Sequence, residues 1–145
     1  TSDISAGQVM DRTGKLLGLP FPSGKALDAL SGGSDCRDLF RVKLDGLQFS
    51  LSGLENKIAQ FRAQGHDDAA AARYAVASVC HAVCAVTAAA QKAYPGLEVV
   101  FSGGVASNAM LRARCAQFAP VFAQPQYSTD NAMGVAVLTY LQEAR

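Results

Sequence analysis

The sequence predicts an α/β fold in which helices pack against a small mixed sheet. After residue 96 a strand pattern and a helix pattern alternate twice, as strand 97–101, helix 102–119, strand 121–125 and helix 128–144. This alternation favours parallel pairing of the two strands with a right-handed crossover. The chain has 145 residues, of which 50% are hydrophobic and 17% are charged. It can therefore bury the core of one domain, or of one lobe of a larger protein.

The first half of the chain predicts three shorter helices and one strand. Apolar residues at helical intervals predict a helix over 4–19, which a glycine and a proline end. A second, short helix is expected over 23–30, with a serine placed to cap its start. "LFRVKL" predicts a strand over 39–44, and after a loop or hairpin the pattern predicts a helix from about 51 to 64.

The longest predicted element is a helix that Asp67 or Asp68 can cap and that ends near Tyr94, before Pro95. It is rich in alanine and apolar over much of its circumference. Small side chains allow other elements to approach closely, so we interpret this segment as a central packing helix. A membrane-associated segment fits less well, because polar residues occur within it.

The four cysteines, Cys36, Cys80, Cys84 and Cys115, form no CxxC pair and no dense disulfide pattern. Cys80 and Cys84 would share one face of the long helix, beside His81. A metal could use such a face. Free cysteine is, however, among the residue types most often buried, so we expect reduced thiols packed in the core.

The charge balance excludes some function classes. The net charge is +1, which gives no electrostatic basis for binding nucleic acid by this chain alone, although RNA could be held by a partner domain. No uncharged run of eighteen apolar residues and no signal-peptide pattern occurs, so we expect a cytoplasmic protein without membrane contact. The chain begins at Thr1 with a sequence typical of the middle of a domain, and we expect an N-terminal lobe to be missing from it.

Polar and glycine residues follow the first of the two predicted strands. In open α/β sheets ligands bind beyond the carboxyl ends of the strands. Gly103 and Gly104 lie at such an end, where glycines let a ligand approach the backbone and the next helix presents its positive end. A tight turn without a ligand explains them equally well. Asn108, one turn into the predicted helix, could bind a base or ribose or lie on a polar face.

Two aspartates are further candidates. Asp130, within "STDN" at the end of the second strand, is suited either to capping a helix or to binding a hard metal ion. Asp11, within "GQVMDR", is either a binding residue or an exposed charge paired with Lys15. No nucleophile elbow and no Ser–His–Asp arrangement can be placed. The residues alone therefore support a ligand-binding α/β lobe without assigning a reaction.

Four segments, in this order along the chain, together resemble one family. "AGQVMDRTGKLLGLPFPSG" resembles AGEAFDKxAKLLGLxYPGG, and "LQFSLSGLENKI" resembles DFSFSGLKT. "SGGVASNAMLR" resembles GGVxxNxxLR, and "STDNAM" resembles TDNxAM. These are motifs of TsaD, the tRNA threonylcarbamoyladenosine transferase family, once labelled O-sialoglycoprotein endopeptidase or glycoprotease. The match corresponds to the C-terminal half of the family's chain.

The resemblance implies one lobe of an actin-like, sugar-kinase-like ATPase fold, with an adenine nucleotide and one divalent metal in the cleft of the complete protein. It further implies transfer of a threonylcarbamoyl group from its adenylate to a tRNA adenosine, with tRNA bound only through the full-length complex and a TsaB-like protein as dimerisation partner. By motif position, the adenosine contacts are Gly103, Gly104 and Asn108, the metal ligand is Asp130, and the substrate contacts are Asp11 and Gly24.

Several positions depart from the family's motifs. The glutamate, the phenylalanine and the first glycine of the first motif are Gln8, Met10 and Ser23, and Lys-Thr after SGL has become Glu55-Asn56. The acidic Glu55 weakens attraction for phosphate there. The family's HxxxH metal motif is not in this chain, so we expect no catalysis from it alone. A non-catalytic nucleotide-binding or scaffold paralogue that dimerises with a partner is the alternative, and a protease ranks last.

Overall fold

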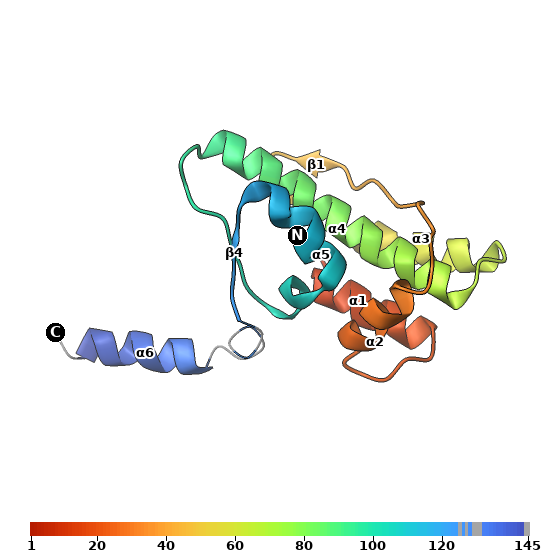
Figure 1. Ribbon diagram of the computed structural model, residues 1–145, viewed down its shortest axis with the longest axis horizontal. Helices are drawn as coiled ribbons and strands as arrows, with labels where there is room; N and C mark the ends of the chain where they lie inside the picture. Colours follow the sequence, from red (N-terminus) through yellow and green to blue (C-terminus); the bar gives the residue numbers. More distant parts are fainter. Residues whose placement is uncertain (125, 127, 129–131, 144–145) are drawn as a thin grey trace.

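The computed structural model describes residues 1–124, 126, 128 and 132–143, and it has a mixed α/β fold with small sheets (Figure 1). Four helices make up most of its body. The predicted helices are confirmed to within a few residues, except the one predicted over 102–119, of which only Ala109–Cys115 is α-helical. Two short 3-10 turns, η1 and η2, flank the fifth helix. In chain order the elements are α1 (Ala6–Leu16), α2 (Gly24–Ser31), β1 (Leu44–Asp45), β2 (Gln48–Phe49), α3 (Ser52–Ala63), α4 (Asp68–Ala93), β3 (Val100–Phe101), η1 (Gly104–Ser107), α5 (Ala109–Cys115), η2 (Ala116–Phe118), β4 (Val121–Phe122) and α6 (Ala132–Glu143).

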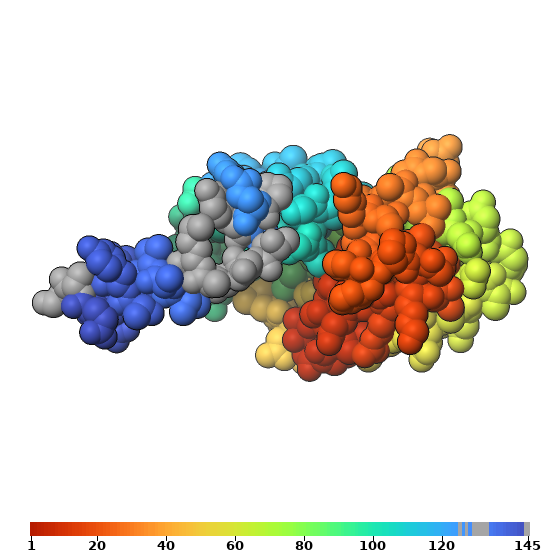
Figure 2. Space-filling model, turned by 90° about the horizontal axis from the view of Figure 1, so that it is seen from below, coloured from red at the N-terminus to blue at the C-terminus, as the bar shows by residue number. Residues whose placement is uncertain are grey.

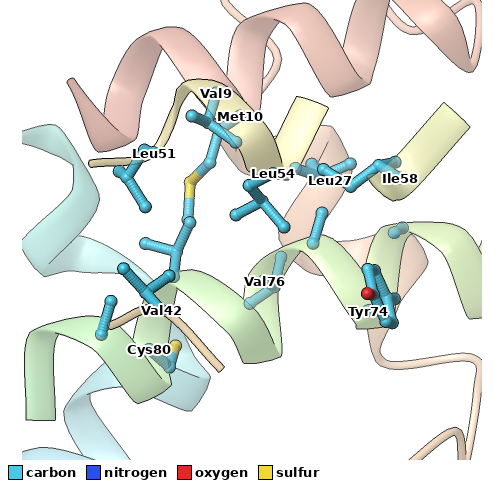
Figure 3. Packing of buried hydrophobic residues seen from close by; sticks show 14 of the residues in the cluster. Val9, Met10, Leu27, Val42, Leu51, Leu54, Ile58, Tyr74, Val76 and Cys80 are labelled. Carbon is cyan, nitrogen blue, oxygen red and sulfur yellow. The ribbon is translucent and has the colours of Figure 1, made fainter. Parts of the chain in front are cut away.

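The long helix α4 is the centre of the core, as predicted. Helices α1, α2, α3 and α5 all pack against it, and Figure 3 shows apolar side chains of α1, α2 and α3 meeting over its surface. Alanines at 71, 72, 75 and 82 are buried and allow this close approach. By length and composition α4 could cross a membrane, but 56% of its most apolar stretch of 18 residues is buried inside the protein. That burial is typical of a core helix.

Side chains cap helices α1, α4 and α5, the last through Asn108. Ser5 and Gln8 form a reciprocal capping box at the start of α1, where the Ser5 Oγ accepts from the Gln8 N–H and the Gln8 Oε1 accepts from the Ser5 N–H. Asp67 caps α4 by accepting a 2.7 Å hydrogen bond from the Ala70 N–H. Ser23 occupies the predicted N-cap position of α2 but makes no capping bond. Its Oγ donates to the Pro20 carbonyl instead.

The strands form two separate two-stranded sheets rather than one mixed sheet. Strands β1 and β2 pair antiparallel as a hairpin, and β3 and β4 pair parallel, which confirms the predicted pairing. The strand predicted over 39–44 contributes only Leu44 to β1. The reason is that the Phe40 N–H donates to the Ser78 Oγ on α4 at 2.8 Å, so a helix takes the place of a neighbouring strand.

Two apolar surfaces are uncovered in the described part of the chain. Helix α6 lies away from the other helices (Figures 1 and 2), and its Leu138 and Tyr140 are 68% and 71% exposed. On the parallel sheet, Val100 and Val121 are likewise exposed. Parallel sheets are normally covered on both faces, so these surfaces are suited to further contacts.

The N-terminal segment is fastened to the start of α3 by Asp3. Its carboxylate accepts hydrogen bonds from the Leu51 N–H at 2.9 Å, from the Ser52 N–H at 3.2 Å and from the Ser50 hydroxyl. These donors, with the Ser50 hydroxyl first, hold the pKa of the Asp3 carboxyl well below its usual range. The contact therefore requires the ionised form of Asp3.

The Asp3 contact predicts acid sensitivity. A pKa that is lower in the folded than in the unfolded state contributes stability above the unfolded value near 4, and that stability is lost as the pH falls toward the folded value. We expect Asp3→Asn to lower the melting temperature at pH 7. The gap between variant and wild type should narrow steadily below pH 4, in thermal melts followed by circular dichroism. A gap of constant size from pH 7 to pH 2.5 would contradict this account.

Candidate functional site

A cavity of about 490 Å³ lies where α1, α2 and the turn after β3 meet. Figure 2 shows this part of the surface, with the α5 region beside α1 and α2. The cavity brings together Asp11, Gly24, Gly104 and Asn108, which are far apart in the sequence and which the sequence selected as candidates. Gly103 is not in its lining. The remaining lining residues are Gly7, Met10, Pro22, Lys25, Asp28, Val105 and Ser107.

The glycines around the cavity have two different roles. Gly103 has a φ of 96°, a left-handed conformation that favours glycine, and it is the N-cap residue of η1. Gly24 and Gly104 have no such φ, and a Cβ at either position would meet no atom within 4 Å. Packing therefore does not demand glycine at Gly24 or Gly104. The missing side chains leave open space in the cavity wall, as a ligand would need.

Asn108 is the N-cap residue of α5 and not a residue one turn into that helix, so the predicted position is corrected. The residues before it form η1, which delays the start of α5. Its Oδ1 accepts from the Leu111 N–H at 2.9 Å and faces the Cys80 Sγ at 3.9 Å. These two donors fix the orientation of the amide. Asn108 therefore both caps α5 and lines the cavity.

The Nδ2 group of Asn108 has no hydrogen-bond partner in the described part of the chain, although the residue is only 6% exposed. Among the described residues it is the only buried side-chain nitrogen or oxygen in this condition. A buried donor without a partner costs about 1–3 kcal/mol. An acceptor atom on a ligand in the cavity would relieve that cost.

Two carboxylates lie in the same cavity wall. Asp11 accepts a 2.8 Å hydrogen bond from the Ser23 N–H through Oδ1, so it fastens α1 to the start of α2 and makes no ion pair with Lys15 in the described structure. Asp28 accepts a 3.0 Å bond from the Ala109 N–H through Oδ2. Each carboxylate has one further oxygen available to accept from a hydroxyl.

Comparison with protein families matches residues 1–137 to TsaD, described as tRNA N6-adenosine threonylcarbamoyltransferase. The chain belongs to the TsaD family. A protein of that name from Streptococcus suis (strain 05ZYH33) is 35% identical over 80% of this chain and 37% of its own length. One from Carboxydothermus hydrogenoformans is 32% identical over 97% of this chain and 45% of its own length. The chain thus spans less than half the length of these curated relatives.

The structure gives a local contact to two of the residues that depart from the TsaD motifs. Gln8, which replaces a glutamate, completes the capping box of α1, as a glutamate also could. Glu55, which replaces a lysine, forms a 2.7 Å ion pair with Arg12 of α1. Both side chains are about half exposed, so the pair contributes less than about 1 kcal/mol. It does neutralise the acidic charge that the substitution introduces.

Arg112, the arginine of the TsaD motif GGVxxNxxLR, holds the turn that carries Gly104 and Asn108. Its Nε donates to the Ala106 carbonyl at 2.9 Å and its Nη2 to the Ala123 carbonyl at 3.2 Å. Its guanidinium also lies 4.6 Å from the ring centre of Phe122. Sequence reasoning gave this residue no role. It also missed Asp28, although the i, i+4 spacing from Gly24 places both residues on one face of α2.

The predicted metal ligand Asp130 lies outside the described residues. Within the described ranges, no three His, Cys, Asp or Glu side chains are placed to hold a metal ion. Cys84 and Cys115 are 3.5 Å apart between their Sγ atoms, and Cys80 is buried. Burial raises the pKa of the Cys80 and Cys115 thiols to about 12. Protonated, packed thiols are what the sequence predicted for these residues.

Proposed function

We propose that this chain is the C-terminal, nucleotide-binding lobe of a tRNA threonylcarbamoyladenosine transferase of the TsaD family. The single observation that carries the proposal is the buried Nδ2 of Asn108, unpartnered among the described residues, because Asn108 lines one cavity together with Asp11 and Gly24. The family membership supplies the reaction. The cavity supplies the reason to place adenosine in this part of the chain.

The chemistry of the cavity suits adenosine. The Asn108 Nδ2 would donate to a nitrogen acceptor of the purine, and the free carboxylate oxygens of Asp11 and Asp28 would accept from the ribose hydroxyls. Met10 and Val105 give the wall an apolar surface, as pockets for flat organic ligands have. In this proposal the open sites at Gly24 and Gly104 admit the ligand.

The rest of the catalytic apparatus belongs to the proposed full-length protein. An actin-like ATPase fold would place an N-terminal lobe across the cleft, with tRNA bound by the whole complex in the cytoplasm. One divalent metal, with Asp130 among its proposed ligands, would supply electrophilic activation of the transferred carbonyl when bound. The threonylcarbamoyl group would pass from its adenylate to the amine of a tRNA adenosine, and AMP would leave.

Complementation tests this function. We expect the full-length protein that contains this chain to restore threonylcarbamoyladenosine in tRNA from a strain depleted of its own TsaD, measured by mass spectrometry of tRNA nucleosides. The matched control is the same protein with Asp11→Asn, which keeps the size of the side chain and removes its charge. Absence of the modification, with the protein present at normal abundance, would overturn the proposal.

A scaffold role is the second candidate, and the exposed apolar surface of α6 favours it. Helix α6 would then bind a TsaB-like dimerisation partner, with or without nucleotide in the cavity. The two functions separate in the complementation experiment. A scaffold paralogue would bind adenine nucleotide or the partner in solution and would leave the tRNA unmodified.

A further inference from the structure

A second hollow of about 500 Å³ adjoins the adenosine cavity on the side of α4. It shares Lys25 and Asp28 with the first cavity, and Arg73 of α4 lies in its wall. The other lining residues are small or apolar, namely Ala29, Ser31, Gly32, Ala109 and Met110. The hollow therefore holds two cationic side chains and one carboxylate.

The two cations lack partners in the described structure. Neither Lys25 nor Arg73 has a carboxylate oxygen within 4 Å, since the ion pairs there are Arg12–Glu55 and Arg62–Asp68. Arg73 is half-buried, yet no described atom accepts a hydrogen bond from its guanidinium. Asp28 is engaged by the Ala109 N–H. The hollow thus keeps an excess of positive charge that faces a ligand space rather than a protein anion.

The start of α2 already holds one anion, since the Asp11 carboxylate accepts from the Ser23 N–H, and the first turn of the helix contributes Lys25 to the second hollow. The helix has no acidic residue in its first turn, and the Ser23 side chain makes no capping bond because it donates to the Pro20 carbonyl. The N–H groups at the start of a helix attract anions. Lys25 is in this same first turn, next to the cavity in which the buried Asn108 Nδ2 also lacks an acceptor.

We propose that Lys25 and Arg73 form a phosphate subsite next to the adenosine cavity. Guanidinium and ammonium groups together suit the oxygens of a phosphate ester. The phosphate could be carried by the nucleotide itself or by an RNA backbone, and both present the same anionic oxygens. The subsite deepens the proposed function and rests on it, because it lies beside the cavity assigned to adenosine.

Titration calorimetry with adenosine and with AMP tests the subsite in this chain. We expect AMP to bind more tightly than adenosine. Arg73→Met, at a residue outside the adenosine cavity, should weaken AMP about threefold to tenfold while changing adenosine less than twofold. Lys25→Met, at a residue that lines both hollows, should weaken AMP by a larger factor than it weakens adenosine. The preference for AMP should shrink in 0.5 M NaCl. Lys92→Met, at the far end of α4, removes the same charge and should change neither affinity.

A second arm uses a short RNA stem-loop and fluorescence anisotropy, with the same variants. Weaker RNA binding by Lys25→Met, with AMP unchanged, would support the subsite and assign it to RNA phosphate. If the chain binds adenosine but Lys25→Met changes neither AMP binding nor RNA binding, the subsite is overturned and the proposed function still stands. Failure to bind adenosine, AMP and RNA alike would overturn both. Because Lys25 is exposed, its variant remains informative even if Arg73→Met unfolds the chain.

Discussion

Gly14→Ala is expected to lower the free energy of unfolding by about 2 kcal/mol, the usual cost of overpacking a filled site. Gly14 lies within α1, and a Cβ there would overlap the Cβ and Oγ of Ser23. Ser23 is 1% exposed, and its N–H donates to Asp11, so it has no room to retreat. Replacing glycine by alanine inside a helix normally raises the free energy of unfolding by up to about 1 kcal/mol. At position 14 the overlap with Ser23 makes alanine destabilising instead. Urea denaturation measures the difference.

A rescue experiment separates the overlap from any other cost of the Gly14 change. The TsaD motif AGEAFDKxAKLLGLxYPGG has alanine at position 14 and glycine at position 23, whereas this chain has Gly14 and Ser23. We therefore expect Ser23→Gly to restore most of the stability lost in Gly14→Ala. Gly53→Ala, in α3 with open space around it, is the matched control and should cost nothing. A double variant no more stable than Gly14→Ala would contradict this explanation.

Asn108→Ser is expected to weaken adenosine binding at least about tenfold, since it removes the buried Nδ2 donor that we propose binds the adenosine. Serine can still accept from the Leu111 N–H as an N-cap residue. The space that the smaller side chain leaves is offset by removal of the unpartnered donor, so the free energy of unfolding should change by less than about 1 kcal/mol. Calorimetry with adenosine and urea denaturation measure the two effects separately.

Asn108→Ala provides the control for the Asn108 prediction. It should weaken binding to the same extent and destabilise the chain further, because the cap of α5 is lost as well. If Asn108→Ser bound adenosine as tightly as the wild type, the unpartnered Nδ2 would have no part in recognition. The assignment of the cavity to adenosine would then lose its main support.

Local signals in the sequence were sufficient for most of the helices, but not for the start of α5, which η1 delays to Ala109. Asp67 and the alanine-rich run defined α4, and the spacing of Leu54, Ile58 and Phe61 correctly predicted the buried face of α3. The strands were predicted too long, because tertiary contacts override propensity in short strands. The Phe40 N–H, which pairs with Ser78 rather than with a strand, is the clearest case.

The site was predicted through motifs rather than through patterns of hydrophobicity. Motif positions selected Asp11, Gly24, Gly104 and Asn108, and the fold places them around one cavity. The contact between Asp28 and the Ala109 N–H was beyond sequence reasoning, since 81 positions separate the two residues. The distance between Asp28 and Ala109 is set by the way α2 and α5 pack on α4.

The central claim is that adenosine binds between α1, α2 and the turn after β3. Amide NMR spectra of the 15N-labelled chain during titration with adenosine test it most directly. The account predicts saturable shifts of the Gly24 and Gly104 amides and of the Asn108 side-chain amide, while Gly65 and Gly96, which do not line the cavity, stay in place. Unchanged Gly24, Gly104 and Asn108 signals at saturating adenosine, or shifts confined to other residues, would contradict it.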